Sequence, residues 1–194
     1  LNYCVEGAYR ADKFSSPAVA PTVNIGGKEN ILELWHGPTC AFKDMALQIL
    51  PHLLTKSMSK VSGGKKAVIL VATSGDTGKA ALEGFRDVAG TEIMVFYPQD
   101  GVSPMQERQM NTQEGGNVHV CAIQGNFDDA QTGVKKLFSD EKLREQLTAR
   151  GIACAVLALP DGCKDVNEVL VQNRDVLQAA CEAATAPQEV QQQP

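Results

Sequence analysis

Between residues 67 and 159 the sequence alternates short apolar runs with stretches of helical periodicity. The apolar runs are 67–72, 92–97, 117–123 and 152–159, and the helical stretches are 77–89, a stretch that begins at Pro104 and stops at Gly115, 128–138 and 141–150. A continuous apolar run is typical of a strand that is buried on both faces. Alternating strands and helices favour parallel pairing with crossover helices. The sequence therefore predicts an α/β fold: an open, mainly parallel sheet with helices on both faces.

The first 62 residues do not share this alternation. Short strands are expected at Val23–Ile25 and Ile31–Trp35, joined by a turn at Gly27–Asn30. Helical spacing of apolar residues begins after Lys43, and Pro51 is expected to kink or restart that helix. This part of the chain is therefore predicted to hold a hairpin followed by a broken helix.

The other end of the chain also differs from the centre. The stretch Ala183–Pro194 is rich in Gln and Pro, which is typical of a disordered tail. We therefore expect three parts. They are 1–62, which carries a candidate cofactor lysine; 63–160, a parallel α/β core; and 161–194, a divergent helical segment with a disordered tail.

Composition excludes several classes of function. The 194 residues carry a net charge of −5, which argues against a nucleic-acid-binding surface. The apolar runs are shorter than the roughly 20 residues of a membrane-spanning helix, so no membrane partner is expected. Six cysteines without a C-x-x-C pair indicate reduced thiols and a cytoplasmic protein. The N-terminus has no initiator Met and no signal pattern, so we expect the chain to begin inside a longer reading frame.

The loop 73–78, Thr-Ser-Gly-Asp-Thr-Gly, follows an apolar strand and precedes a helix. Backbone N–H groups at such a helix start can bind an anion, and ligands of parallel sheets lie at the carboxyl ends of the strands. A plain helix cap is the alternative reading of the same residues. A Walker loop is disfavoured, because Thr73 stands where that motif needs Gly and Ala80 where it needs Ser or Thr.

Lys43 stands at the head of an apolar-periodic run, just after the turn-prone residues 37–39. Apolar neighbours such as Phe42 and Met45 indicate partial burial, which favours the neutral amine and makes it nucleophilic toward a carbonyl. A solvated surface lysine is the alternative. His36 either positions a substrate or fills the end of a strand. Asp128 and Asp129 lack a third carboxylate nearby, so no metal site is predicted.

Taken together, these segments resemble threonine synthase, a pyridoxal-phosphate enzyme of the fold-type II group. The matching segments are 32–44 (LELWHGPTCAFKD), 72–81 (ATSGDTGKAA), 97–103 (YPQDGVS), 106–110 (QERQM) and 125–131 (GNFDDAQ). They occur in family order and extend to about residue 145. The first two segments are specific in combination.

The resemblance implies a cofactor and roles for particular residues. Lys43 would carry pyridoxal 5′-phosphate as a Schiff base and act as the base for proton transfers. The loop residues Thr73, Ser74, Gly75, Asp76 and Thr77 would receive the substrate carboxylate, with Asp76 also near the 3′-oxygen of the cofactor and His36 as a further substrate contact. The family converts O-phospho-L-homoserine and water to L-threonine and phosphate, and the cofactor ring serves as electron sink.

The chain also departs from the family pattern. The later Gly/Asn loop for the cofactor phosphate and the hydroxyl residue at the pyridine nitrogen are missing, and the roughly 45 C-terminal residues do not match. We therefore read the chain as an incomplete fold-type II structure. Two alternatives stay open: another fold-type II lyase, which the His36 to Asp44 segment disfavours, and a truncated or chimeric remnant that acts at most as a binding module. The oligomeric state is not predicted.

Overall fold

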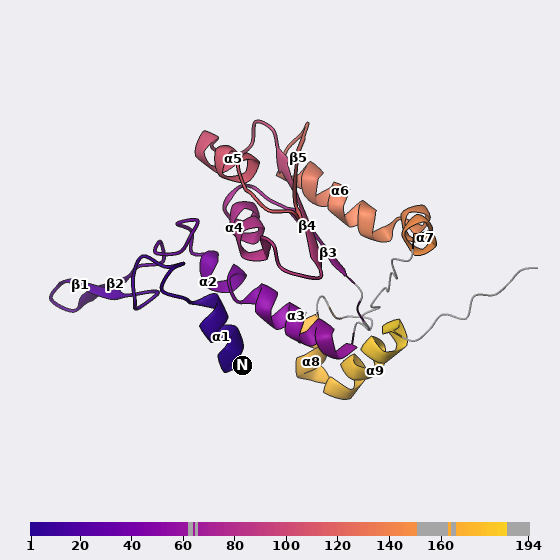
Figure 1. Cartoon of the computed structure of the whole chain (residues 1–194), viewed down its shortest axis with the longest axis horizontal. Coiled ribbons are helices and arrows are strands. Elements are labelled where there is room, and N and C mark those ends of the chain that lie inside the picture. The colour runs from indigo at the N-terminus through magenta and orange to yellow at the C-terminus, as the bar shows by residue number, and fades with distance from the viewer. Residues whose placement is uncertain (62–63, 65, 151–162, 164–165, 186–194) are drawn as a thin grey trace, which may run out of the picture. The chain divides into compact units, whose positions relative to one another are not determined.

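The structure of the chain is a computed structural model that describes residues 1–61, 64, 66–150, 163 and 166–185 (Figure 1). Contacts divide the chain into two units, Leu1–Glu141 and Lys142–Pro194, and each unit is described by itself. The strand predicted at 152–159 lies outside the described residues. The predicted division into three parts stays a prediction.

A parallel sheet of three strands forms the centre of the first unit. The strands are β3 (Ala67–Ala72), β4 (Thr91–Pro98) and β5 (Val118–Ile123), in the order β3-β4-β5. Their register places Val71 beside Val95 and Val95 beside Val120. Crossover helices join consecutive strands, as parallel pairing requires. The predicted α/β fold with a parallel sheet is confirmed.

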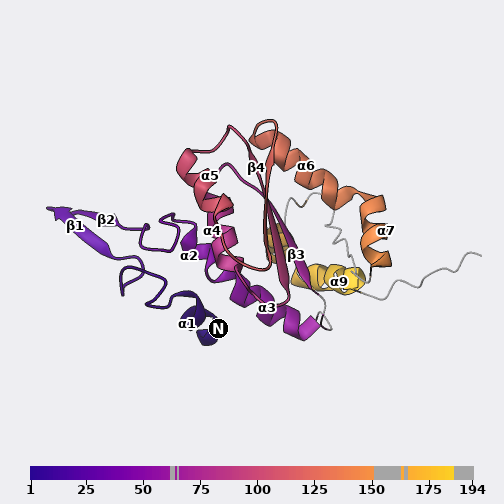
Figure 2. The ribbon, with the colours of Figure 1, turned by 45° about the horizontal axis from the view of Figure 1, so that its top comes forward.

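Helices cover both faces of this sheet (Figures 1 and 2). The helices on one face are α4 (Asp76–Phe85) and α5 (Pro104–Asn111), and α6 (Phe127–Ser139) covers the other face. The core between α4, α5 and β4 contains Leu82, Phe85, Ile93 and Met110, each at most 1% exposed. β3 is less buried than predicted, since Val68 is 49% exposed.

Two helix ends differ from the sequence prediction. The helix predicted at 77–89 ends at Phe85, because Arg86 adopts an extended conformation and Asp87 has a φ of 54°. The helix α5 begins as predicted, with Ser103 as its N-cap and Pro104 in its first turn, and ends at Asn111, before Gly115. Helix starts carry side-chain caps that sequence can reveal, whereas these ends are set by the turns that follow.

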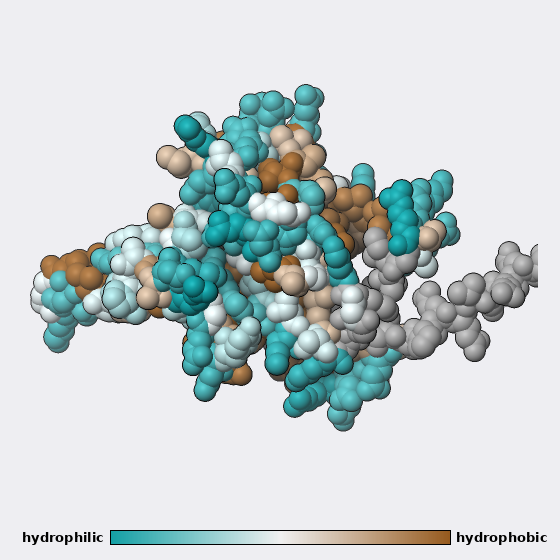
Figure 3. All heavy atoms as spheres, viewed as in Figure 1, coloured by the Kyte–Doolittle hydropathy of each residue, from teal (hydrophilic) through white to brown (hydrophobic). Residues whose placement is uncertain are grey.

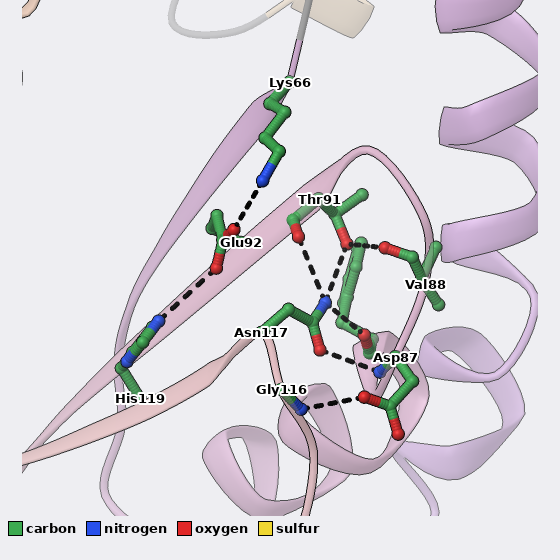
Figure 4. Close-up of polar contacts among 9 residues, drawn as sticks. Lys66, Asp87, Val88, Thr91, Glu92, Gly116, Asn117 and His119 are labelled. Carbon is green, nitrogen blue, oxygen red and sulfur yellow. Dashed lines mark hydrogen bonds and ion pairs between the residues drawn. The ribbon is translucent and has the colours of Figure 1, made fainter.

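The turn between α4 and β4 is fastened to the start of β5 by the side chain of Asn117 (Figure 4). Its Nδ2 donates to the carbonyl oxygens of Phe85 (3.0 Å) and Thr91 (3.1 Å), and its Oδ1 accepts from the N–H of Asp87 (2.7 Å). The Asp87 carboxylate in turn accepts from the N–H of Gly116 (2.8 Å). These bonds satisfy backbone groups that the early end of α4 exposes.

The N-terminal part holds the predicted hairpin and the predicted broken helix. The hairpin strands are β1 (Thr22–Gly26) and β2 (Glu29–Leu32), and the helices are α1 (Asn2–Ala8), α2 (Asp44–Leu47) and α3 (Leu50–Val61). The second strand ends at Leu32 rather than at Trp35. The hairpin residues are exposed, and Figure 3 shows hydrophobic side chains at its end. The helix restarts next to Pro51, as expected.

A close contact places α2 against α4. The Gly84 backbone lies so near the carbonyl oxygen of Leu47 that a Cβ atom at position 84 would overlap it. Glycine at this position therefore permits the two helices to touch. The partly buried Leu47 and Leu54 also pack against the core residues of α4 and β4. The segment that carries Lys43 is in this way attached to the helix that follows the loop 73–78.

Most described residues of the second unit are helical. Its helices are α7 (Glu141–Ala149), which begins at the last residue of the first unit, α8 (Val166–Gln172) and α9 (Arg174–Thr185), and α8 packs against α9. The tail predicted from Ala183 onward is wrong for its first residues, because α9 continues to Thr185; residues 186–194 lie outside the description. None of the described helices has the length and apolar character needed to cross a membrane.

Candidate functional site

The loop 73–78 follows the carboxyl end of β3, as the sequence predicts, and its last three residues already form the first turn of α4, which begins at Asp76. Thr73 is 1% exposed, and its Oγ1 accepts hydrogen bonds from the N–H groups of Gly75 (2.9 Å) and Gly78 (2.8 Å). The hydroxyl group therefore faces the loop backbone and closes the first turn of α4. This is the capping role that the sequence left open as an alternative, and it fixes the shape of the loop.

Three other backbone N–H groups of the same loop, those of Ser74, Asp76 and Thr77, have no hydrogen-bond partner within the described part of the chain. They lie at the start of a helix of 10 residues, where the helix dipole favours a negative charge. Gly75 enables this arrangement with a φ of 137°. The loop can therefore offer N–H donors to an anion, as the sequence predicts.

Asp76 presents a carboxylate beside these donors. Its Oδ1 accepts from Nε2 of Gln106 (2.9 Å) and lies 3.2 Å from Nζ of Lys79. The hydrogen bond from Gln106, and then Lys79, hold the pKa of Asp76 below its ordinary value, although burial acts in the opposite direction. The side chain is 47% exposed. Asp76 is therefore an ionised group that remains accessible to a ligand.

Lys43 is half-buried and immediately precedes α2. Its Nζ lies 4.9 Å from the centroid of the Phe42 ring, which is a cation–π distance. The turn before it is fastened by the buried Asp44, whose carboxylate accepts from the N–H (2.9 Å) and the hydroxyl group (2.7 Å) of Thr39. A Cβ atom on Gly37 would collide with Asp44, so this glycine is required by packing.

Both ring nitrogens of His36 are engaged within the chain. Nδ1 lies 2.8 Å from Oγ of Ser15, and Nε2 lies 2.7 Å from Oε2 of Glu33. The ring also stacks on Trp35. These contacts favour the interpretation that His36 connects the residues after β2 to the loop around Ser15. A substrate contact of His36 stays a prediction.

A pocket of about 280 Å³ lies between the turn 37–39, α4 and α5. Its lining residues are Pro38, Thr39, Lys79, Glu83, Arg86, Gln109, Thr112, Gln113 and Glu114. The turn that precedes Lys43 and the helix that follows the loop 73–78 therefore meet at one cavity. Neither Lys43 nor His36 is among the residues that line it.

Sequence reasoning missed two residues of this neighbourhood, Gln106 and Lys79. Gln106 stood three residues after Ser103, which is the spacing of a capping box and could have drawn attention to it. Its hydrogen bond to Asp76 joins residues that are 30 positions apart, so no local sequence pattern predicts it. Lys79 is only 8% exposed, which is unusual for a lysine and could not be read from its neighbours.

Removing the Thr73 hydroxyl group should destabilise the loop. We expect Thr73→Val to lower the free energy of unfolding by about 1–3 kcal/mol, because the N–H groups of Gly75 and Gly78 lose their acceptor in a buried place. Urea unfolding followed by circular dichroism measures this. Ser74→Ala is the matched control, since Ser74 is exposed, and a loss of equal size in the control would contradict the capping role.

Curated relatives match about two thirds to three quarters of the chain. A threonine synthase from Pseudomonas aeruginosa is 50% identical over 128 residues, which cover 66% of this chain and 27% of that protein. A threonine synthase from Eremothecium gossypii is 41% identical over 156 residues, covering 75% and 30%. No protein-family model matches the chain.

Solved structures agree with these relatives. A pyridoxal-phosphate-bound threonine synthase from Brucella melitensis superposes with a TM-score of 0.68 at 36% identity, covering 97% of this chain and 38% of that one. The chain is a partial match to threonine synthases. Threonine synthase from yeast gives a TM-score of 0.65 at 38% identity, covering 73% and 29%. The predicted resemblance and the fold-type II architecture are confirmed.

The match is confined to part of each threonine synthase. The chain spans less than a third of the two curated relatives and 38% of the Brucella structure. The roles of single residues in this chain are not decided by these likenesses.

Proposed function

We propose that this chain is the cofactor-lysine part of a threonine synthase, which converts O-phospho-L-homoserine and water to L-threonine and phosphate. One observation supports this most: α2, which Lys43 immediately precedes, packs against α4, which begins at the loop 73–78. A primary amine and a set of N–H groups that can bind an anion are thereby attached to one pair of packed helices.

The residues present fit pyridoxal 5′-phosphate. Lys43 supplies a half-buried amine that can bond to the aldehyde, and Asp76 supplies an ionised carboxylate next to N–H donors. When bound, the cofactor supplies an electron sink for the substrate's α-carbon. We assign Lys43 to cofactor binding and proton transfer. We assign Asp76 to contact with the cofactor's 3′-oxygen.

The loop binds and orients the substrate in this proposal. The N–H groups of Ser74, Asp76 and Thr77 receive the substrate carboxylate, and Gly75 leaves room for its approach. Thr73 acts by holding the loop in shape, since its hydroxyl group is bonded to the backbone. His36 can bind substrate only by releasing Ser15 or Glu33.

A second candidate is a remnant that binds ligands without catalysis. The observation that favours it is that neither Lys43 nor His36 is among the residues that line the pocket beside α4. A related fold-type II lyase is the other alternative. We place the protein in the cytoplasm, with a small-molecule substrate and neither nucleic acid nor membrane as partner.

Release of phosphate tests the proposal. We expect the purified chain, with pyridoxal 5′-phosphate added, to release phosphate from O-phospho-L-homoserine slowly and to form threonine in equal amount. Binding of the cofactor without release of phosphate would contradict the synthase proposal and favour the binding module. Formation of a keto acid and ammonia instead of threonine would favour another lyase.

A further inference from the structure

The side chain of Gln106 connects the start of α5 to the loop 73–78. Its Oε1 accepts from the N–H of Ser103 (3.0 Å), while its Nε2 donates to Oδ1 of Asp76 (2.9 Å). The Ser103 hydroxyl group accepts from the N–H of Gln106 in return (3.2 Å), which completes a capping box. Because both ends of the amide group are bonded, its direction is fixed.

The same amide group also covers the backbone of the loop. A Cβ atom on Gly75 would overlap the side-chain amide of Gln106, so the two are in close contact. Gly75 has a φ of 137°, which other residues rarely adopt. Gln106 therefore contacts two successive residues of the loop, one through packing and one through a hydrogen bond.

Gln106 contacts Asp76 from another element of the fold, since Gln106 lies on α5 and Asp76 on α4. Among the described residues, the charged group paired with Asp76 is Lys79, which lies one turn along the same helix, at 3.2 Å. Because Lys79 extends from the same helix, this pair does not tie the carboxylate to another element. Gln106 extends from α5 and is itself held by its capping bond, so its hydrogen bond ties the carboxylate to a second element.

We infer that Gln106 is a positioning residue, which holds the carboxylate of Asp76 in the orientation that the ligand of the loop meets. This inference rests on the proposed function, in which Asp76 contacts the cofactor. Gln106 itself then contacts neither substrate nor cofactor and acts through Asp76. The α5 helix becomes part of the site, because its capping box fixes the group that orients the loop.

Gln106→Glu separates the two bonds of this side chain. A glutamate can still accept from the N–H of Ser103, so the capping box and α5 remain. It cannot donate to Asp76 when ionised, and it adds a negative charge beside it. We expect the pKa of Asp76 to rise, while the urea midpoint stays near that of the parent chain. The pKa is measured from the carboxyl carbon resonance of Asp76 by NMR titration of the chain without ligands.

The same variant should weaken binding. We expect the KM for O-phospho-L-homoserine to rise about tenfold, as for the loss of one hydrogen bond to a charged group, with a smaller change in kcat. Gln131→Glu is the matched control. It makes the same chemical change at an exposed position of α6, on the other face of the sheet, and it should leave the titration of Asp76 unchanged.

The two readouts separate this inference from the proposed function. The titration needs no cofactor and no turnover, so it tests the bond to Asp76 even if the chain releases no phosphate. An unchanged pKa of Asp76 in Gln106→Glu, or an equal rise in Gln131→Glu, would overturn the inference. A raised pKa together with an unchanged KM would show that the bond exists but does not position the site.

Discussion

Replacing Lys43 with alanine is expected to abolish covalent capture of pyridoxal 5′-phosphate by this chain. Lys43 is half-buried beside Phe42 and immediately precedes α2, and in the proposed function it is the amine that bonds to the aldehyde of the cofactor. Treatment of the mixture with borohydride makes the bond permanent. Peptide mass spectrometry then locates the attached pyridoxyl group, which we expect on Lys43 in the parent chain.

Lys60→Ala is the control for this experiment. Lys60 lies exposed on α3, and its replacement removes one amine without touching the proposed site. Capture should persist in this variant. If Lys43→Ala retained capture at the parent level, with the label on Lys79 or on surface lysines, the assignment of Lys43 would be wrong.

Replacing Phe85 with alanine is expected to cause a large loss of stability. Phe85 is 1% exposed and packs with Leu82, Ile93 and Met110 in the core of the first unit. Truncation of a buried phenylalanine costs about 3–5 kcal/mol. That is a large part of the roughly 5–15 kcal/mol that a domain has available. Urea unfolding followed by circular dichroism should show a much lower midpoint.

Phe138→Ala makes the same change at the surface. Phe138 is 59% exposed on α6, so we expect its replacement to alter the free energy of unfolding by no more than about 0.5 kcal/mol. Equal losses in the two variants would contradict the core described for α4, α5 and β4. Since Phe85 ends the helix that begins at the loop, the variant should also weaken capture at Lys43.

The alternation of apolar and helical patterns was sufficient to predict most of the first unit. The run 67–72 became β3 with the same bounds, because the apolar side chains that favour the strand all lie within the run itself. The end of α4 was not predictable, since it depends on the bonds that Asn117 makes from 30 positions away. The exposure of Val68 likewise depends on which elements flank the sheet, and periodicity alone carries no such information.

The candidate site was predicted in part. Local motifs identified Lys43 and the loop 73–78, and the structure attaches both to one pair of packed helices. Thr73 was predicted to bind substrate, yet its hydroxyl group is bonded to the loop backbone. Gln106 stands in one of the matching segments but was given no role, because its contact with Asp76 is made across two helices. Short motifs therefore indicate candidate groups, and packing decides which neighbours orient them.

The most direct test asks whether one small molecule touches both Lys43 and the loop. An isotope-labelled chain is reacted with pyridoxal 5′-phosphate, reduced with borohydride, and compared by amide NMR with the untreated chain and with treated Lys43→Ala. The account predicts that the amide resonances of Ser74, Asp76 and Thr77 shift in the treated parent chain alone. Shifts confined to α2 and the residues that precede it, with the loop unchanged, would contradict the account.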